Sequence, residues 1–375
     1  MDTIAKGWII YRKTAGFVKQ EIYEVERLME TAPKWGYELQ VVDPHDVELL
    51  ATGGEFLGLF LNGERVPLPD FVIPRIGSGT TYFAMAVLRQ LEGLGVYCLN
   101  GAEAVDSARD KLKHLQILSA ANVPIPKTLL VKFPVDIDFV EREMGFPIVV
   151  KTVVGTQGSG VHLCKDRESL SDLVEFVEAN NPIAQLVLQE FLAESKGIDL
   201  RLVVIGGRVV AGMQRIAKKG FKANVSQGGT AEEIDPSPSL RWLATEVARV
   251  LDLDMTGIDF LKCNKYGYRI CEVNSSPGFE GLEKYCDIDI ADQIFQFLNV
   301  VFRVPYEQRK QALDKSGKAL PETKVVPKKK AATRRSSSSK SGAKKTTSKK
   351  STSKKSTSKK ATSKKVTSKK RTARK

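Results

Sequence analysis

Short apolar stretches alternate with amphipathic ones along the first hundred residues. Runs of Ile, Val, Leu and aromatic side chains predict buried strands, and they fall at residues 8–11, 39–42, 71–75 and 96–99. Apolar side chains at helical spacing predict helices at 19–35 and 80–93, and the pattern of 46–70 indicates a loop with a hairpin. Strands and helices that alternate in this way are typical of an open parallel sheet covered by helices.

The later part of the chain mixes hairpins with helices. Gly206-Gly207 separates two apolar runs at 200–205 and 208–215, which is a hairpin signal. Residues 104–121 are expected to form one helix that ends before two prolines. Further strands are expected at 147–154, 161–164 and 186–192, and further helices at 167–179, 240–251 and 287–302.

The formal net charge of +14 is unevenly distributed along the chain. Residues 324–375 hold 22 Lys and Arg and no acidic residue, so residues 1–323 carry 36 basic and 44 acidic side chains. The body is therefore mildly acidic, and the basic character belongs to a tail. A length of 375 residues exceeds one compact core and favours two or three domains.

The five cysteines are widely spaced, and no two of them form a CxxC motif. An odd number without metal-binding spacing argues against a disulfide framework or a zinc site and indicates a reducing compartment. No run of 18 apolar residues occurs, and the first residues lack the features of a signal peptide. We therefore expect a cytoplasmic protein without membrane attachment.

Residues 346–370 consist of five pentads of the form TTSKK, STSKK, ATSKK or VTSKK. Because the segment has no aromatic and almost no apolar side chains, it cannot form a core and is expected to be disordered. Its charge would bind phosphate polyanions with strong salt dependence and little sequence preference. RNA, ribosomes and DNA all fit this chemistry, and the alternative is a solubilising extension.

Oxygen-bearing side chains gather in a predicted hairpin that pairs residues 258–263 with 268–273. Asp259 lies between two apolar residues on the first strand, and Glu272 and Asn274 are two positions apart on the second. Because side chains alternate along a strand, Glu272 and Asn274 point to one face. Hard oxygen ligands of this kind suit Mg²⁺. The alternative is the exposed polar face of an ordinary hairpin.

A second signal for phosphate binding is a lysine inside an apolar strand. Lys151 interrupts the β-branched run of 147–154, and a lysine there is costly to bury unless it meets an anion. The loop that follows contains Gly158, Ser159 and Gly160, and its glycines would let backbone N–H groups approach phosphates closely. Since the loop joins two strands, the pattern favours a hairpin lid over a P-loop.

Three arginines also interrupt or end apolar strands. Arg75 follows the strand at 71–75, where open α/β sheets present ligands, and a guanidinium there could clamp a carboxylate. The alternative for Arg75 is a surface ion pair. Arg201 and Arg215 lie in the hairpin strands and are the candidate catalytic residues, as a clamp for a phosphate or an acyl phosphate.

Taken together, these motifs resemble the RimK-type ATP-grasp ligases. The matching segments are, in chain order, VIPRIG, ARDKL, VVK…GTQGSG, QEF…DLR, GIDF and EVNSSPG. The resemblance as a whole covers roughly residues 8–303. The resemblance implies an ATP-grasp fold of the α+β kind, preceded by an α/β domain with an open parallel sheet. The expected division is 1–104 (pre-ATP-grasp domain), 105–192 (central lid subdomain), 193–305 (metal-binding subdomain) and 306–375 (disordered basic tail).

The resemblance also implies ligand roles for individual residues. Asp259, Glu272 and Asn274 would hold Mg²⁺ or Mn²⁺, as two ions, against the phosphates of ATP. Asp199 matches the position expected at the ribose hydroxyls. Lys222 stands where the family commonly has Arg, in a loop that is one residue shorter. The implied ATP contacts are Lys111, Lys151, Gly158, Ser159, Gly160, Gln189, Glu190, Phe191, Leu192, Asp199, Lys222, Ala223 and Asn224.

The activity implied by the resemblance is an ATP-dependent ligation of a carboxylate to an amine. The first hypothesis is a glutamate ligase that extends the carboxyl terminus of a protein of the ribosomal type, with Arg75 contacting substrate. The alternatives are a ligase for a small molecule or cofactor, and a nucleic-acid-binding protein that senses nucleotide. RimK-type proteins are often oligomeric, so a homo-oligomer is also open. For Lys111 the alternative is an exposed helical lysine.

Overall fold

The computed structural model describes most of the first 303 residues. The described ranges are 5–12, 22–52, 58–76, 82–152, 160–218, 220–221, 223, 228–265 and 267–303. Four predicted ATP contacts lie outside these ranges, namely Gly158, Ser159, Lys222 and Asn224. The basic tail lies outside them as well, so its predicted disorder stays a prediction.

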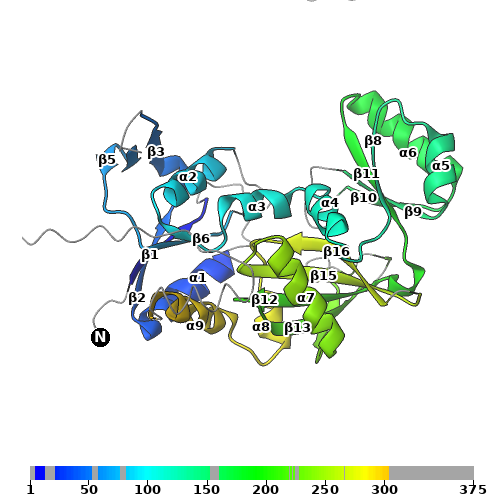
Figure 1. Cartoon of the computed structure of the whole chain (residues 1–375). Helices are drawn as coiled ribbons and strands as arrows, with labels where there is room; N and C mark the ends of the chain where they lie inside the picture. The colour runs from blue at the N-terminus through cyan, green and yellow to red at the C-terminus, as the bar shows by residue number, and fades with distance from the viewer. Residues whose placement is uncertain are drawn as a thin grey trace, which may run out of the picture. The chain divides into compact units, whose positions relative to one another are not determined.

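A parallel sheet forms the N-terminal part of the fold (Figure 1). Its strands run in the order β2 (Tyr37–Val42), β1 (Ala5–Ile10), β6 (Phe71–Pro74) and β7 (Tyr97–Cys98), and all neighbours are parallel. One face packs on α1 (Ile22–Thr31) and the other on α2 (Tyr82–Gly93). The predicted open sheet is therefore confirmed. The loop region forms a small antiparallel sheet of β3 (Val47–Leu50), β4 (Gly58–Leu61) and β5 (Glu64–Arg65).

The segment expected to form one helix at 104–121 contains two. They are α3 (Ala102–Arg109) and α4 (Lys113–Ala120). Asp110 separates them because its side chain accepts hydrogen bonds from the backbone N–H groups of Leu112 and Lys113, both at 2.9 Å. A carboxylate that binds the backbone in this way competes with a continuous helix. The prediction of one helix was wrong for this reason.

An antiparallel sheet with its own core forms the middle of the chain. Its strands run in the order β10 (Val161–Cys164), β9 (Ile148–Thr152), β11 (Gln185–Glu190) and β8 (Thr128–Lys132). Two helices, α5 (Ile137–Met144) and α6 (Arg167–Asn180), pack on one face through Val140, Leu170 and Val174. Strand alternation directs Val150 into this core and Lys151 to the opposite face.

A five-stranded antiparallel sheet carries the candidate site. Its strands run in the order β14 (Thr230–Glu233), β13 (Arg208–Ile216), β12 (Ile198–Ile205), β15 (Met255–Cys263) and β16 (Gly267–Asn274). One face packs on α7 (Pro238–Val250), which crosses β12 and β13 in Figure 1. The other face packs, through residues such as Val203 and Met255, on α8 (Glu280–Tyr285) and α9 (Ile290–Arg303). The two predicted hairpins are therefore confirmed.

A bulge interrupts the β15–β16 ladder beside the predicted metal ligands. Asp259 pairs with Glu272, whereas the next residue, Phe260, pairs with Ile270, so Cys271 is the extra residue. Bulges of this kind redirect side chains and are common next to functional sites. Here the bulge allows Asp259 and Glu272 to share one face while Phe260 and Ile270 both stay in the α7 core. Plain alternation did not predict it.

Among the described helices, none has the combination of length and apolarity that a membrane span requires.

Candidate nucleotide and metal site

The strand register brings charged residues to one face of the five-stranded sheet. Asp199 lies opposite Arg215 between β12 and β13, and Arg201 lies opposite Asp259 between β12 and β15. Glu272 lies opposite Asp259 on the next strand. Because directly opposed residues point to the same side of a sheet, all five side chains share one face. Farther along the strands, the same face packs on α8 and α9.

Two arginines and two aspartates form a continuous ionic network on this face. Arg201 binds Asp259 through two hydrogen bonds of 2.7 and 2.8 Å. Arg215 binds Asp199 at 2.6 and 2.8 Å and also reaches Asp259 at 2.8 Å. Burial alone would raise the pKa of Asp259, but the charges of Arg201 and Arg215 outweigh it and lower the pKa to about 2. Asp259 is therefore an anion throughout the physiological pH range.

The donor set of the predicted metal ligands fits Mg²⁺. Two carboxylates and an amide oxygen are hard oxygen ligands, which Mg²⁺ prefers. The carboxylate of Glu272 is exposed and has no hydrogen-bond or ion-pair partner within the described ranges. Each oxygen of Asp259 accepts from guanidinium groups, and a carboxylate oxygen offers two lone pairs. The described residues hold no metal site built from three His, Cys, Asp or Glu side chains.

Two predicted phosphate ligands approach this face from earlier segments. The Nζ atom of Lys151 donates to Gln189 Oε1 at 2.7 Å and contacts the Sγ atom of Cys271 at 3.6 Å. Lys111 donates to the backbone oxygen of Thr152 at 2.9 Å. Burial lowers the pKa of Lys111, an effect that the charge of Glu272 opposes and that of Lys151 reinforces. Both lysines therefore lie within electrostatic reach of the acidic hairpin.

Gly160, another predicted ATP contact, closes the ladder beside Lys151. It has a φ of +72°, which disfavours side chains, and a Cβ there would lie 2.4 Å from Thr152 Oγ1. Glycine is therefore required at the point where the chain returns from the predicted lid.

The predicted adenine-binding segment at 189–192 makes contacts within the protein. The Glu190 carboxylate accepts a hydrogen bond from the backbone N–H of Lys127 at 2.9 Å. Phe191 meets the ring of Phe221 edge to face at a centroid distance of 6.3 Å. Leu192 and Ala223 are buried. The ATP contacts assigned to these residues and to Asp199 stay predictions.

Arg75 is buried at the end of β6, so the alternative of a surface ion pair was wrong. Its side chain is 1% exposed, and its Nη1 atom donates to the backbone oxygen of Pro277 at 3.1 Å. Its Nη2 atom lies 4.0 Å from the carboxylate of Glu24, and the guanidinium covers the ring of Phe279. Neither Nε nor Nη2 has a hydrogen-bond partner among the residues that the structure describes.

Sequence reasoning missed a buried histidine near the lysines. His114 on α4 is 1% exposed, and its Nδ1–H donates to the backbone oxygen of Asp110 at 2.7 Å. Burial lowers the pKa of His114 from 6.5 to about 4, and the charge of Lys151 contributes in the same direction. No motif marks this residue, because only the break between α3 and α4 brings its ring to the Asp110 carbonyl.

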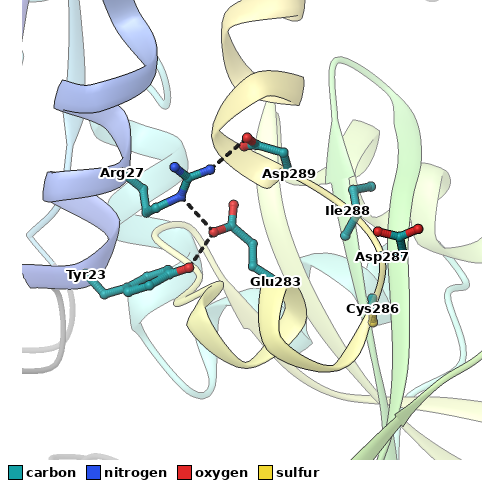
Figure 2. A pocket seen from close by; sticks show the side chains of 7 residues that line it. All are labelled: Tyr23, Arg27, Glu283, Cys286, Asp287, Ile288 and Asp289. Atoms are coloured by element: carbon teal, nitrogen blue, oxygen red, sulfur yellow. Dashed lines mark hydrogen bonds and ion pairs between the residues drawn. The ribbon is translucent and has the colours of Figure 1, made fainter.

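Two surface pockets lie away from the residues discussed so far. One, of about 530 Å³, lies between α1 and the segment that joins α8 to α9 (Figure 2). Figure 2 shows Tyr23 and Arg27, both on α1, directed at the carboxylate of Glu283, with hydrogen bonds of 2.6 and 3.0 Å. The second, of about 380 Å³, lies beside β13 and β14. Neither is lined by a predicted ATP or metal ligand that the structure describes.

Family comparison accounts for nearly all of the described chain. Residues 108–298 match the RimK-like ATP-grasp domain, and residues 18–105 match the RimK PreATP-grasp domain. The chain belongs to the RimK-type ATP-grasp family. It is therefore an ATP-grasp ligase, an enzyme that forms C–N bonds, as the resemblance predicted.

Two curated relatives are similar over most of their length. A probable alpha-L-glutamate ligase of Thioalkalivibrio sulfidiphilus (strain HL-EbGR7) is 41% identical over 281 residues, which cover 74% of this chain and 92% of the relative. A ribosomal protein bS6–L-glutamate ligase of Salmonella schwarzengrund (strain CVM19633) is 38% identical over 279 residues, with the same coverage of 74% and 92%.

Solved structures confirm the predicted ATP-grasp fold. The ATP-grasp ligase PsnB, complexed with a phosphomimetic variant of its minimal precursor, Mg and ADP, superposes with a TM-score of 0.62 at 20% identity. The match covers 80% of this chain and 99% of that structure. D-alanine–D-alanine ligase from Bacillus anthracis superposes with a TM-score of 0.57 at 16% identity, covering 82% of this chain and 99% of that structure.

Because of His114 on α4, we expect the protein to lose stability in mild acid. Because the folded-state pKa of His114, about 4, lies below the ordinary 6.5, the unfolded chain binds the proton first. The free energy of unfolding is therefore unaffected by this group above pH 6.5, and it decreases as the pH falls from 6.5 to 4. The expected loss is on the order of 3 kcal/mol. Denaturant unfolding at a series of pH values measures it.

His114→Gln should flatten the pH dependence between 6.5 and 4. The control, His162→Gln, removes an exposed histidine and should keep the wild-type slope. Equal slopes for wild type and His114→Gln would contradict the assignment.

Proposed function

We propose that this enzyme uses ATP and Mg²⁺ to add glutamate to the carboxyl terminus of a protein. The observation that carries the proposal is the meeting of three groups on one sheet face: the Asp259–Glu272 pair, the two arginines, and the lysines from earlier segments. The relatives at 41% and 38% identity are named as glutamate ligases, and the second acts on ribosomal protein bS6. A ribosomal protein is therefore the proposed acceptor.

The chemistry needs two balanced steps. The terminal carboxylate of the acceptor attacks the γ-phosphorus of ATP and ADP leaves, which converts the carboxylate to an acyl phosphate. The amine of glutamate then attacks the acyl carbon, inorganic phosphate leaves, and a proton is released from the nitrogen. No enzyme nucleophile is required, so catalysis depends on positioning and on fixed charges.

Each charged group of the site has a proposed part in this reaction. Asp259, Glu272 and Asn274 would hold Mg²⁺, which supplies positive charge against the phosphates when bound. Lys111 and Lys151 would bind phosphate oxygens. In support, Lys151 contacts Cys271, which directly precedes Glu272, and the charge of Glu272 acts on Lys111.

The two arginines would stabilise the charge that develops on the acyl phosphate. Arg201 and Arg215 are held by Asp259 and Asp199 through Nε and Nη2. Their Nη1 atoms have no partner within the described ranges and are the donors that we assign to substrate. Preorganised donors of this kind cost no reorganisation during the reaction.

Arg75 is the proposed ligand for a substrate carboxylate. Among the described residues, its buried Nε and Nη2 atoms have no hydrogen-bond partner, and the nearby carboxylate of Glu24 lies at 4.0 Å, beyond hydrogen-bond distance. Buried donors without a partner are costly. A carboxylate that accepts from both atoms would pair the guanidinium in the bidentate geometry that arginine favours. The position of Arg75 at the carboxyl end of a parallel strand agrees with where α/β sheets bind ligands.

ADP release in the presence of Mg²⁺ tests the proposed reaction. We expect turnover to require glutamate together with a protein acceptor, and mass spectrometry to find glutamyl residues on its carboxyl terminus. Glu272→Gln should lower the rate about 100-fold, because it replaces a charged metal ligand by a neutral amide. The thermal midpoint should stay unchanged, since the Glu272 side chain is exposed.

The matched control for this variant is Glu233→Gln. Glu233 is an exposed carboxylate on β14, the edge strand on the opposite side of the same sheet from β16. It should keep the wild-type rate. A fully active Glu272→Gln variant would contradict the metal assignment, and turnover with a small-molecule acceptor alone would favour the cofactor ligase.

We also propose that the basic tail concentrates the enzyme on nucleic acid, ribosomes included. The 22 basic residues of 324–375 would release counterions from a phosphate polyanion, which adds affinity that salt removes. A tethered weak interaction raises the local concentration of substrate without a new contact at the active site.

We expect removal of the tail to cause a loss of activity that depends on the salt concentration. A chain of residues 1–323 should modify a ribosome-bound acceptor more slowly than the full chain at low salt, and at the same rate at high salt. Both proteins should modify the free acceptor equally, which is the control for intact chemistry. Equal rates on ribosomes at every salt concentration would contradict the role of the tail.

A further inference from the structure

The segment that follows the metal-binding strand is held, almost residue by residue, by the N-terminal domain. β16 ends at Asn274, and the chain continues as Ser275-Ser276-Pro277-Gly278-Phe279-Glu280. The Ser276 hydroxyl donates to the backbone oxygen of Pro74 at 2.8 Å, and the Pro277 oxygen accepts from Arg75 at 3.1 Å. Each of these two partners lies 202 positions away in sequence.

Asn100 binds both sides of the metal-binding hairpin at once. Its Nδ2 atom donates to the backbone oxygens of Met255, at 2.7 Å, and Ser275, at 2.8 Å. Its Oδ1 atom accepts from the N–H of Met255 at 2.9 Å. The side chain is 1% exposed, so these bonds form away from water. Asn100 therefore ties the start of β15 to the residue that directly follows Asn274.

Glu24 holds the far end of the same segment. One carboxylate oxygen accepts from the backbone N–H groups of Phe279, at 2.8 Å, and Glu280, at 3.3 Å. Glu24 is 1% exposed and lies on α1, next to the Tyr23 and Arg27 side chains that bind Glu283. A buried carboxylate is retained at a helix start where it satisfies orphan N–H groups.

These contacts between the N-terminal domain and residues 275–280, which we call the clamp, matter because β16 is an edge strand. Among the described strands it pairs only with β15, and on its other edge the N–H of Ile270 donates to the backbone oxygen of Pro124 at 2.9 Å. The part of β16 that holds Glu272 and Asn274 lies beyond this bond, where β15 is its described strand partner. The packing beyond the strand is tight as well, since a Cβ at Gly257, the partner of Asn274, would lie 2.8 Å from the Pro277 ring. Movement of the segment by a small distance would therefore displace the metal ligand that precedes it.

We infer that the N-terminal domain contributes to the divalent-cation site by positioning Asn274, and that Asn100 is the positioning residue. Asn100 acts through Ser275 on Asn274, and Ser276 and Glu24 hold the rest of the segment. The inference rests on the proposed function, because it takes Asn274 as a metal ligand. It assigns to the N-terminal domain a role in metal affinity in addition to any contact with substrate.

Mn²⁺ binding in the presence of ADP, followed by electron paramagnetic resonance on the full chain, tests this directly. Asn100→Asp keeps the shape but replaces two donated hydrogen bonds by acceptor–acceptor repulsion, and Mn²⁺ should bind about tenfold more weakly. Ser276→Ala removes one hydrogen bond in the segment itself, and we expect about threefold weaker binding. ADP affinity in the presence of a chelator should stay at the wild-type value for both variants.

Trp35→Phe is the matched control. It removes a different hydrogen bond between the domains, from the Trp35 indole to Asp292 at 2.7 Å, and leaves the clamped segment intact. Mn²⁺ affinity should not change. Because Ser276→Ala is the milder change, it tests the inference even if Asn100→Asp fails to fold.

The possible results separate the two claims. Wild-type Mn²⁺ affinity in a folded Asn100→Asp or Ser276→Ala variant would overturn the clamp alone. Weaker binding in Trp35→Phe to the same extent would also overturn it, because any loosened domain contact would then suffice. A wild-type protein that binds no Mn²⁺ would overturn the proposed metal site and, with it, the inference.

Discussion

A buried carboxylate between two guanidinium groups is the constraint on which the site depends. Asp259 is 5% exposed, and its charge is tolerable only because Arg201 and Arg215 donate to both of its oxygens. Removing one partner from such an arrangement leaves an uncompensated buried charge, which is more costly than losing the contact itself. The network therefore fixes three strands relative to one another. The strand register places both arginines on the same face of the sheet as Glu272.

Local patterns in the sequence were sufficient to predict most strands and to single out candidate site residues, whose roles stay predictions. Lys151 in an apolar run and the spacing of Glu272 and Asn274 mark functions that a core cannot explain, and strand periodicity then sets their faces. The bulge at Cys271 and the helix break at Asp110 were not predictable in this way. Each depends on a balance between local hydrogen bonds and distant packing, which a single stretch of sequence does not contain.

The contacts between domains were hidden for a related reason. Asn100 and Glu24 lie outside the matching motifs, Ser276 lies in EVNSSPG without a predicted role, and the partners of all three lie far away in sequence. Only the folded chain shows that a domain remote from the acidic hairpin supplies hydrogen bonds to the segment behind it. The apolar cluster that joins α1, α9 and the five-stranded sheet explains why these bonds are buried, and so why they are stronger than exposed ones. The PreATP-grasp and ATP-grasp domains are thus packed against each other through one apolar core.

We propose that oxygens of the β15–β16 hairpin hold the cation that binds the ATP phosphates opposite the lysines. A crystal structure of the enzyme with ADP and Mg²⁺ would show this most directly. We expect Mg²⁺ within about 2.1 Å of oxygens from Asp259, Glu272 and Asn274, with Lys151 on a phosphate. A cation bound elsewhere, or phosphates that lie away from this hairpin, would contradict it.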